Sequence, residues 1–352
     1  MNRSEIFTTL LEKRPWTDYE WEKRTNITRA TFGNNRRNNG QNVKSRTLEL
    51  MAKATGFKLI QTNAKKGILP SSAEALFELI ENKNKKIRIG LFGFGRIGRN
   101  IFRIGYNDPR FNFVAISDLG DVEAMHYLLM RDSIHGSMDD EILLNGNDLT
   151  YDGNSTRLLP GSAPGTIPWD AFDVDIVIDS TGVYRKKEQL QLHLDSGARR
   201  VLVTKPPADE IDRIVIQGIN HDKINSKDQI ISTTSSTTQV LALMLKVLDQ
   251  NFGIENAMMT NVHAYTSDQP LADSVRSDLR RSRSAVENII PNETWAPDYV
   301  SQLLPKFKNK ISGMAMNVPV ANGSCVDLTT EMSSMPSIEE VNNAFKDASE
   351  NE

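Results

Sequence analysis

The chain has 352 residues, of which 39% are hydrophobic and 25% charged, as in an ordinary globular protein long enough for two or three domains. No apolar run approaches the roughly 18 residues that span a bilayer, and the first residues lack the apolar core of a signal peptide. The single cysteine, Cys325, excludes an internal disulfide framework and a cysteine-based metal site. We therefore expect a cytoplasmic protein without a membrane segment or a metal centre.

The net charge of −3 is unevenly distributed along the chain. Residues 1–88 contain 18 Lys and Arg against 9 Asp and Glu, whereas the remainder contains 24 basic and 36 acidic residues. This asymmetry predicts two modules with different partners. The alternative is a basic extension that only aids solubility.

Residues 1–80 predict a small all-α domain, followed by a polar linker at 81–86. Ser4 and Thr28 are expected to cap two helices, Ser45 to start another, and residues 17–20 form a capping-box pattern. A last helix is expected from Ser71 or Ser72 to about Ile80. The apolar positions expected to face inward are Ile6, Phe7, Leu10, Leu11, Leu48, Met51 and Ala52.

The order of these helices resembles a helix-turn-helix of the phage-repressor type, in which the second helix of the pair enters the major groove of DNA. Arg29, Arg36 and Arg37 lie on the corresponding helix and could contact phosphates and base edges. We therefore predict DNA as a possible partner of residues 1–80. A helical cap or an oligomerisation arm is the alternative.

Residues 87–106 carry the pattern of a dinucleotide-binding unit. A short apolar strand, 87–92, runs into Gly93-Phe94-Gly95-Arg96-Ile97-Gly98, and a helical pattern follows. Between a strand and a helix, these glycines permit a tight turn, approach of the backbone to a pyrophosphate, and close helix packing.

A second predicted strand, 113–117, ends at Asp118, 20 residues after Gly98. This is about the spacing expected for the acid that binds the adenine ribose. A carboxylate there repels a 2′-phosphate, so the pattern favours NAD over NADP. The alternative is that Asp118 only caps the next helix.

From residue 87 to about 345 the chain resembles the glyceraldehyde-3-phosphate dehydrogenase family. The matching stretches are collinear and comprise Gly93 to Arg99, Arg131 to Gly136, Val174 to Gly182, Ala198 to Thr204, Gly218 to His221 and Ser232 to Gln239. The resemblance implies an α/β fold, with a Rossmann-type NAD-binding domain at 87–235 and an α+β catalytic domain at 236–352. It adds Ser180, Thr181 and Gly182 to the residues expected to bind the cofactor.

The resemblance also locates an active site, in which the nucleophilic residue differs from that of the family. Ser236 stands where the family has its nucleophilic cysteine, and His263 stands where the family has the imidazole that activates it. A serine hydroxyl is almost never ionised at neutral pH. An acyl-serine is also less reactive toward phosphate than a thioester. The alternative for Ser236 is an inert helix cap.

The substrate-phosphate residues are partly kept. Family positions that bind phosphate through hydroxyls are matched by Ser235, Thr237, Thr266 and Thr294. The family's glycine after the last of these is Trp295, expected to fill space where an anion would sit, and its phosphate-binding arginine is Asn317. Lys205 is a further departure, because a small residue commonly precedes this proline in the family.

The chain ends soon after a helix matched at 341–346, whereas the family continues through further strands and a closing helix. We therefore expect a C-terminally short catalytic domain with one core edge uncovered. The segment 265–291 resembles the family's interface loop and suggests a homo-oligomer.

Three functions follow from these residues. The first is a degenerate, NAD-binding relative with impaired catalysis, acting as a DNA-binding regulator if the N-terminal module binds DNA. The second is an active NAD-dependent aldehyde dehydrogenase acting on a sugar phosphate. The third is a hydrolase using Ser236 and His263, for which no orienting acid is identifiable.

Overall fold

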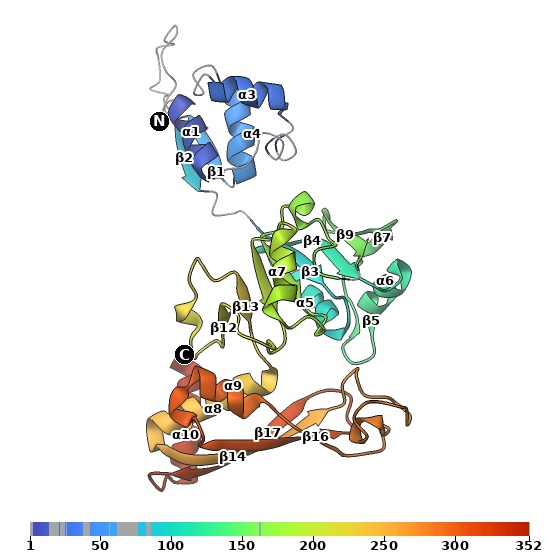
Figure 1. Cartoon of the computed structure of the whole chain (residues 1–352), viewed down its shortest axis with the longest axis vertical. Helices are drawn as coiled ribbons and strands as arrows, with labels where there is room; N and C mark the ends of the chain where they lie inside the picture. Colours follow the sequence, from blue (N-terminus) through green and yellow to red (C-terminus); the bar gives the residue numbers. More distant parts are fainter. Residues whose placement is uncertain are drawn as a thin grey trace. The chain divides into compact units, whose positions relative to one another are not determined.

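The computed structural model describes residues 3–13, 21, 25, 27–37, 43–55, 57–61, 77–81, 86–161 and 163–351. The chain divides into two compact units, Met1–Lys86 and Ile87–Glu352 (Figure 1). No helix within the described segments is both long and apolar enough to cross a membrane.

The first unit contains helices α1 (Arg3–Lys13), α3 (Arg29–Arg37) and α4 (Ser45–Thr55), and strands β1 (Phe57–Gln61) and β2 (Phe77–Glu81). Six of the seven side chains expected inside are buried, and Leu11 packs against them. Trp21 stacks on Phe32 with 5.4 Å between the ring centroids. These apolar side chains form a core of their own, separate from the second unit.

Two of the three predicted helix starts are confirmed. Thr28 caps α3, since its hydroxyl accepts the Thr31 N–H at 3.4 Å and its carbonyl accepts the Phe32 N–H, and α4 begins at Ser45. The prediction for Ser4 is wrong, because α1 already includes Arg3. The capping box at 17–20 lies outside the described residues.

The prediction of an all-α first unit is also wrong. Residues 77–81 form strand β2, which pairs antiparallel with β1 from Phe57 opposite Glu81 to Gln61 opposite Phe77. The predicted helix was expected to open at Ser71 or Ser72, and these residues lie outside the described part. Fifteen residues separate the end of the partner strand β1 from the start of β2, so local periodicity gives no information about the pairing.

The second unit is built on a nine-stranded sheet with the order β12-β13-β11-β10-β3-β4-β9-β8-β7. The strands from β12 to β9 are parallel, and β8 and β7 continue antiparallel. Their bounds are β3 (Ile87–Phe92), β4 (Phe111–Asp118), β7 (Leu143–Asn145), β8 (Asp148–Tyr151), β9 (Asn154–Pro160), β10 (Ile176–Asp179), β11 (Arg200–Val203), β12 (Arg213–Ile214) and β13 (Ile230–Ser232). A small pair, β5 (Arg131–Asp132) and β6 (Gly136–Ser137), stands apart.

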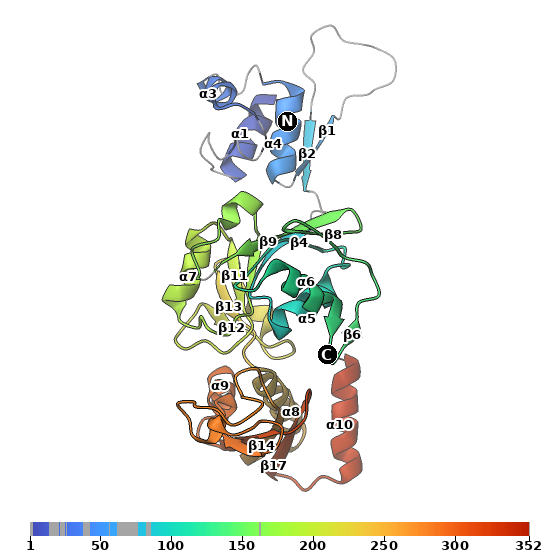
Figure 2. The same cartoon turned by 90° about the vertical axis from the view of Figure 1, so that its right-hand side faces the viewer.

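Both faces of this sheet are covered. Helices α5 (Arg96–Gly105) and α6 (Val122–Met130) bury Phe102 and Leu129 on one face. Helix α7 (Lys187–Asp195) and the 3₁₀ helix η1 (Trp169–Phe172) cover the other face (Figure 2). The predicted doubly wound, Rossmann-type arrangement is thereby confirmed.

The remaining residues form a four-stranded sheet, β15-β16-β14-β17. It comprises β14 (Ile254–Ala264), β15 (Ile290–Asn292), β16 (Ile311–Val318) and β17 (Ser324–Met332). Helices α8 (Ser236–Phe252) and α9 (Ala296–Leu303) pack on one face, and α10 (Ile338–Asn351) contacts α8. Short 3₁₀ helices lie at His221–Lys223 (η2), Arg280–Ser282 (η3) and Pro305–Phe307 (η4).

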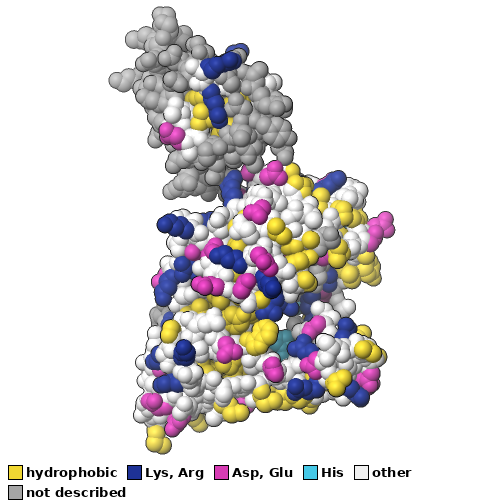
Figure 3. Space-filling view, viewed as in Figure 1, with side chains coloured by type: hydrophobic (Ala, Val, Ile, Leu, Met, Phe, Trp, Pro, Cys, Tyr) yellow, Lys and Arg dark blue, Asp and Glu magenta, His cyan; other side chains and the backbone are white. Residues whose placement is uncertain are grey.

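The visible face of the second unit carries interspersed acidic and basic side chains with apolar groups between them (Figure 3). This face therefore has no broad field of a single sign that would attract a polyanion.

Candidate cofactor and active site

The predicted cofactor residues gather at the carboxyl edge of the parallel strands. Strand β3 lies between β4 and β10, so the strand order reverses there, and such a reversal is where open α/β sheets bind their ligands. The residues that end or follow these three strands are Gly93, Phe94, Gly95, Arg96, Ile97, Gly98, Asp118, Ser180, Thr181 and Gly182.

The three glycines of the loop have different local requirements. Gly93 has φ +91°, and a Cβ there would meet the Thr181 backbone nitrogen at 2.8 Å. A Cβ on Gly98 would lie 2.1 Å from the Gly93 carbonyl oxygen. A Cβ on Gly95 would meet nothing within 4 Å. The first and third glycines are therefore required by packing. The second faces open space, where the pyrophosphate of a ligand can come close to the protein backbone.

Asp118 ties the end of β4 to the glycine loop. Its Oδ2 accepts the Phe94 N–H at 2.5 Å, and its Oδ1 accepts the Gly120 N–H at 2.9 Å. The cap of α6 is Asp121, whose carboxylate accepts the Glu123 and Ala124 amides. Asp118 is therefore not the helix cap of the alternative reading, and its carboxylate keeps lone pairs for ribose hydroxyls.

The turn after β10 is fixed by a buried polar cluster. Asp179 Oδ1 accepts the Thr181 N–H at 2.9 Å and the Thr181 hydroxyl at 2.7 Å. Its other oxygen lies 3.6 Å from Nε2 of His193, whose Nδ1 accepts the Trp169 indole N–H at 3.1 Å. Because Nδ1 accepts, the proton of a neutral His193 ring sits on Nε2 and faces Asp179. Ser180 adds a hydroxyl bond to the Gly93 carbonyl at 2.7 Å.

These features fit a dinucleotide. The loop offers open space at Gly95 and the amino end of α5, where free N–H groups favour phosphate. Asp118 lies at the end of the neighbouring strand. Within the described residues, no group of three His, Cys, Asp or Glu side chains is placed to hold a metal ion.

Ser236 is the first residue of α8 and is exposed. The helix cap is its neighbour Ser235, whose hydroxyl accepts the Thr238 N–H at 3.1 Å and bonds the Thr238 hydroxyl at 2.7 Å. Neither the cap nor any side-chain hydrogen bond among the described residues involves the Ser236 hydroxyl. The cap of the alternative reading is therefore Ser235, and the Ser236 hydroxyl is accessible at a helix N-terminus.

His263 lies on the same side of β14 as the start of α8. Asn261, two residues earlier on that strand, donates to the Thr237 hydroxyl at 3.0 Å, and residues two apart share one face of a strand. Nδ1 of His263 lies 2.7 Å from the Ala264 carbonyl, which can only accept. The proton of the neutral ring is thus on Nδ1, and Nε2 keeps the lone pair of a base. A carbonyl, not a carboxylate, orients the ring, which argues against a hydrolase triad.

Thr266 belongs to a charged group. Its hydroxyl donates to Asp268 Oδ1, while Asp268 Oδ2 pairs with Arg281 at 2.6 Å. Burial by itself would raise the pKa of the Asp268 carboxyl. The Thr266 hydroxyl and the positive charges of Arg281 and Lys205 more than offset this and hold the pKa below its usual value.

Asn317 is occupied by neighbouring amides. Its Nδ2 donates to Gln269 Oε1 at 2.5 Å, and its Oδ1 accepts from Asn292. Strand β16 sets Asn317 beside His263 in parallel register. Position 317 therefore carries a neutral, internally bonded group instead of a cation.

Thr294 and Trp295 lie at the start of α9. The Thr294 hydroxyl accepts the Ala296 N–H at 3.3 Å. The Trp295 ring is 54% exposed and lies 5.0 Å from the Arg185 guanidinium. Its exposed ring therefore contacts Arg185, a residue of the cofactor-binding half.

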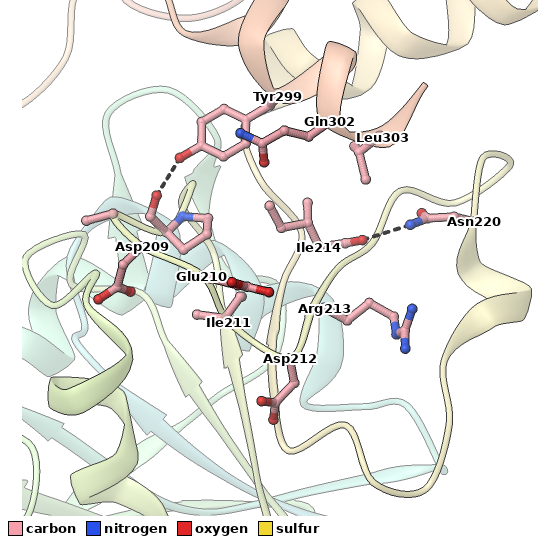
Figure 4. Close-up of a pocket in the computed structure, with 12 residues that line it drawn as sticks. Asp209, Glu210, Ile211, Asp212, Arg213, Ile214, Asn220, Tyr299, Gln302 and Leu303 are labelled. Atoms are coloured by element: carbon pink, nitrogen blue, oxygen red, sulfur yellow. Dashed lines mark hydrogen bonds between the residues drawn. The ribbon is translucent and has the colours of Figure 1, made fainter. Parts of the chain in front are cut away.

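A cavity of about 600 Å³ lies at a different place, lined by the segment 207–214 together with Asn220, Tyr299, Gln302 and Leu303 (Figure 4). Tyr299 donates to the Pro207 carbonyl across it. Lys187 already binds two of the carboxylates that line the cavity. Its backbone N–H donates to Asp209, and its side-chain amine forms an ion pair with Asp212. The lining includes neither Ser236 nor His263, so this cavity is separate from the predicted site.

In the first unit, Arg36 and Arg37 are exposed in the last turn of α3. Arg29 is the first residue of the same helix, and its side chain lies outside the described part. The structure thus places all three candidate residues on one helix.

Comparison with known proteins agrees with this geometry. The family model for the NAD-binding domain of glyceraldehyde 3-phosphate dehydrogenase matches residues 87–187, and the model for its C-terminal domain matches 235–352. The glyceraldehyde-3-phosphate dehydrogenase of Geobacillus stearothermophilus is 43% identical over 267 residues, covering 76% of this chain and 79% of the relative. Glyceraldehyde-3-phosphate dehydrogenase 2 of Streptomyces avermitilis is 44% identical, with coverages of 76% and 80%.

The chain belongs to the glyceraldehyde-3-phosphate dehydrogenase family. Its cofactor is NAD, which when bound supplies the hydride acceptor for this family of oxidoreductases. At the predicted cofactor-binding residues, called here the cofactor cradle, the fold holds the glycine loop, Asp118 and the 180–182 turn in fixed positions.

Several residues of the site escaped prediction. Arg281 stands in the basic run 280–283, which gives no indication that one member pairs with Asp268. His193 and Trp169 lie on separate elements and meet only in the folded protein. Lys205 was visible as a departure from the family, but its neighbours were not.

Proposed function

We propose that this protein binds NAD at residues 93–98, 118 and 180–182 and that its phosphorylating dehydrogenase activity is lost or strongly reduced. One observation carries the proposal: an exposed serine hydroxyl, Ser236, begins α8 where the family has a thiol. The hydroxyl must lose its proton during attack, whereas a thiol beside an imidazole is already partly ionised. The amide at Asn317 adds no charge to bind a substrate phosphate.

NAD binding and turnover are measured separately. Calorimetric titration with NAD is expected to show binding, while NAD with glyceraldehyde 3-phosphate and phosphate is expected to give little reduced cofactor. Ser236→Cys is expected to raise turnover by at least about tenfold, because it restores an ionisable nucleophile beside His263. Ser236→Ala, the matched control, should remain at the wild-type level. Robust wild-type turnover that Ser236→Ala abolishes would overturn the proposal.

That outcome would instead support the second candidate, an active NAD-dependent aldehyde dehydrogenase acting on a sugar phosphate. The orientation of His263 favours it, because the hydrogen bond at Nδ1 leaves Nε2 as the nitrogen that could act as a base for Ser236. His263→Gln would then abolish turnover, with a bell-shaped pH profile in the wild type.

We also propose that residues 1–80 bind DNA, which would make the protein an NAD-linked regulator. The support is the exposed basic end of α3, capped by Thr28 at its start, in a chain segment with 18 basic and 9 acidic residues over positions 1–88. A mobility shift on random duplex DNA should weaken steeply with salt and should be lost in Arg36→Ala/Arg37→Ala. Lys53→Ala on α4 is the control. Absence of a shift at low salt ends this proposal.

We further propose a cytoplasmic homo-oligomer. The support for an oligomer is the segment 265–291, which exposes Leu271, Val275, Leu279 and Ile289. Light scattering on the full chain, with Val275→Asp as a test variant, would show whether these side chains are buried between copies. A wild-type monomer at micromolar concentration would exclude it.

A further inference from the structure

Lys205 occupies a central place at the carboxyl edge of the sheet. It follows β11, which lies between β10 and β13. The turn after β10 contains Gly182, and the segment after β13 leads to Ser236. Strand order therefore sets Lys205 between the predicted cofactor turn and the nucleophile position.

Contacts fix the course of this side chain. The Lys205 carbonyl accepts the Ser232 hydroxyl at 2.7 Å, and Ser232 in turn accepts the Thr234 N–H at 2.9 Å. A Cβ on Gly182 would lie 2.7 Å from Lys205 Cε, 2.8 Å from Nζ and 2.9 Å from Cδ. The end of the lysine chain thus takes the space that the glycine leaves free, and its ammonium group lies over the 180–182 turn.

The charge of this ammonium group is not paired. Lys205 is exposed, and among the described residues it makes no ion pair within 4.0 Å and no side-chain hydrogen bond. Its positive charge helps to lower the pKa of the Asp268 carboxyl, which is already bonded to Arg281 and Thr266. A lysine amine with three donors is therefore left available to a ligand.

We propose that Lys205 is a specificity-determining residue that binds the phosphate ester of a small ligand lying between the 180–182 turn and the segment 266–268. This inference rests on the proposed function, in that it names the ligand class of the same site. The neutral Asn317 amide is hydrogen-bonded to Gln269 and Asn292 and cannot supply the positive charge that binds a phosphate ester. A lysine binds phosphate as a point charge on a flexible stem.

Calorimetry on the NAD-saturated full chain tests this directly. The probes are glyceraldehyde 3-phosphate and glyceraldehyde, which differ by the phosphate ester. Lys205→Ala should weaken binding of the phosphate ester by about tenfold, as expected for loss of a charged hydrogen bond. Glyceraldehyde binding should not change. Lys205→Arg should retain most of the affinity, and Lys227→Ala, an exposed lysine on a distant loop, should match the wild type.

Other outcomes separate the possible failures. Equal loss for both probes, no loss for either, or no measurable preference of the wild type for the phosphate ester would overturn the inference. If Lys205→Ala lost only NAD affinity, the Lys205 ammonium group would bind the cofactor and not the phosphate ester. That result would also overturn the inference. Competition by inorganic phosphate in the wild type but not in Lys205→Ala would support a phosphate contact that needs no sugar. Failure of the wild type to bind NAD, or robust turnover, counts against the proposed function instead.

Discussion

The cofactor cradle at 87–235 and the nucleophile region at 236–352 depend on different kinds of interaction. The cradle is held by backbone geometry: glycines at 93 and 98 that packing requires, and carboxylates of Asp118 and Asp179 that bind main-chain N–H groups. The nucleophile region depends on the identity of single functional groups at 236 and 317. A backbone site keeps its shape when surface side chains change, whereas one exchanged atom alters a chemical site.

The largest expected effect is on NAD binding, and two glycines of the cofactor loop test it in different ways. Gly98 is required by packing, whereas Gly95 faces open space. Gly98→Ala places a Cβ 2.1 Å from a backbone oxygen, so we expect loss of NAD binding by at least about 100-fold together with a lower melting temperature. Gly95→Ala meets no atom within 4 Å, so it should weaken NAD binding while leaving the melting temperature unchanged. Calorimetry and thermal unfolding distinguish the two. A stable Gly98→Ala variant with normal NAD affinity would contradict the account of the cradle.

The next effect tests the amide network of the nucleophile region. Asn317→Ala removes partners from Gln269 and Asn292, so we expect a loss of about 1–3 kcal/mol in the free energy of unfolding. Urea unfolding measures this. Asn256→Ala, which breaks only an exposed bond to Glu331, should cost less than about 0.5 kcal/mol. Similar losses in both variants would show that the network adds nothing special.

A smaller effect is expected at the buried cluster beneath the cofactor turn. Trp169→Phe deletes the N–H that His193 Nδ1 accepts while keeping an aromatic ring, so we expect destabilisation of about 1–2 kcal/mol. Trp295→Phe changes a ring that is 54% exposed and should be close to neutral. Unfolding in urea compares them, and a neutral Trp169→Phe variant would mean that the indole bond does not support this turn.

The smallest effect concerns pH. The Arg213 hydrogen bond, with help from the Asn225 amide, holds the pKa of Asp228 below its usual value. A lowered folded-state pKa stabilises the fold above the unfolded value of about 4, and this contribution is lost as the pH falls through the folded value. Asp228→Asn should therefore lower the melting temperature at pH 7, and its difference from wild type should shrink under more acidic conditions. Asp139→Asn, which changes an exposed carboxyl group, is the matched control.

Much of the second unit could be predicted because its signals are local. The strand at 87–92, the glycine loop and the helix after it follow one another in sequence, and the structure has β3 with the same bounds. Strand β2 could not be predicted in this way, because its pairing with β1 depends on residues across an intervening segment. Similarly, the sequence could not tell which of the neighbouring hydroxyl side chains caps α8. The folded structure shows that Ser235 is the cap.

The sequence by itself determined the family, the NAD cofactor and the presence of Ser236 at the position of the family's thiol, since motif order and residue identity are properties of the chain. The tertiary structure decided which side chains meet. Strand order brought Lys205 beside Gly182, and pairing of distant segments joined Arg281 to Asp268 and His193 to Asp179. These contacts depend on how strands pack side by side, which no local pattern specifies.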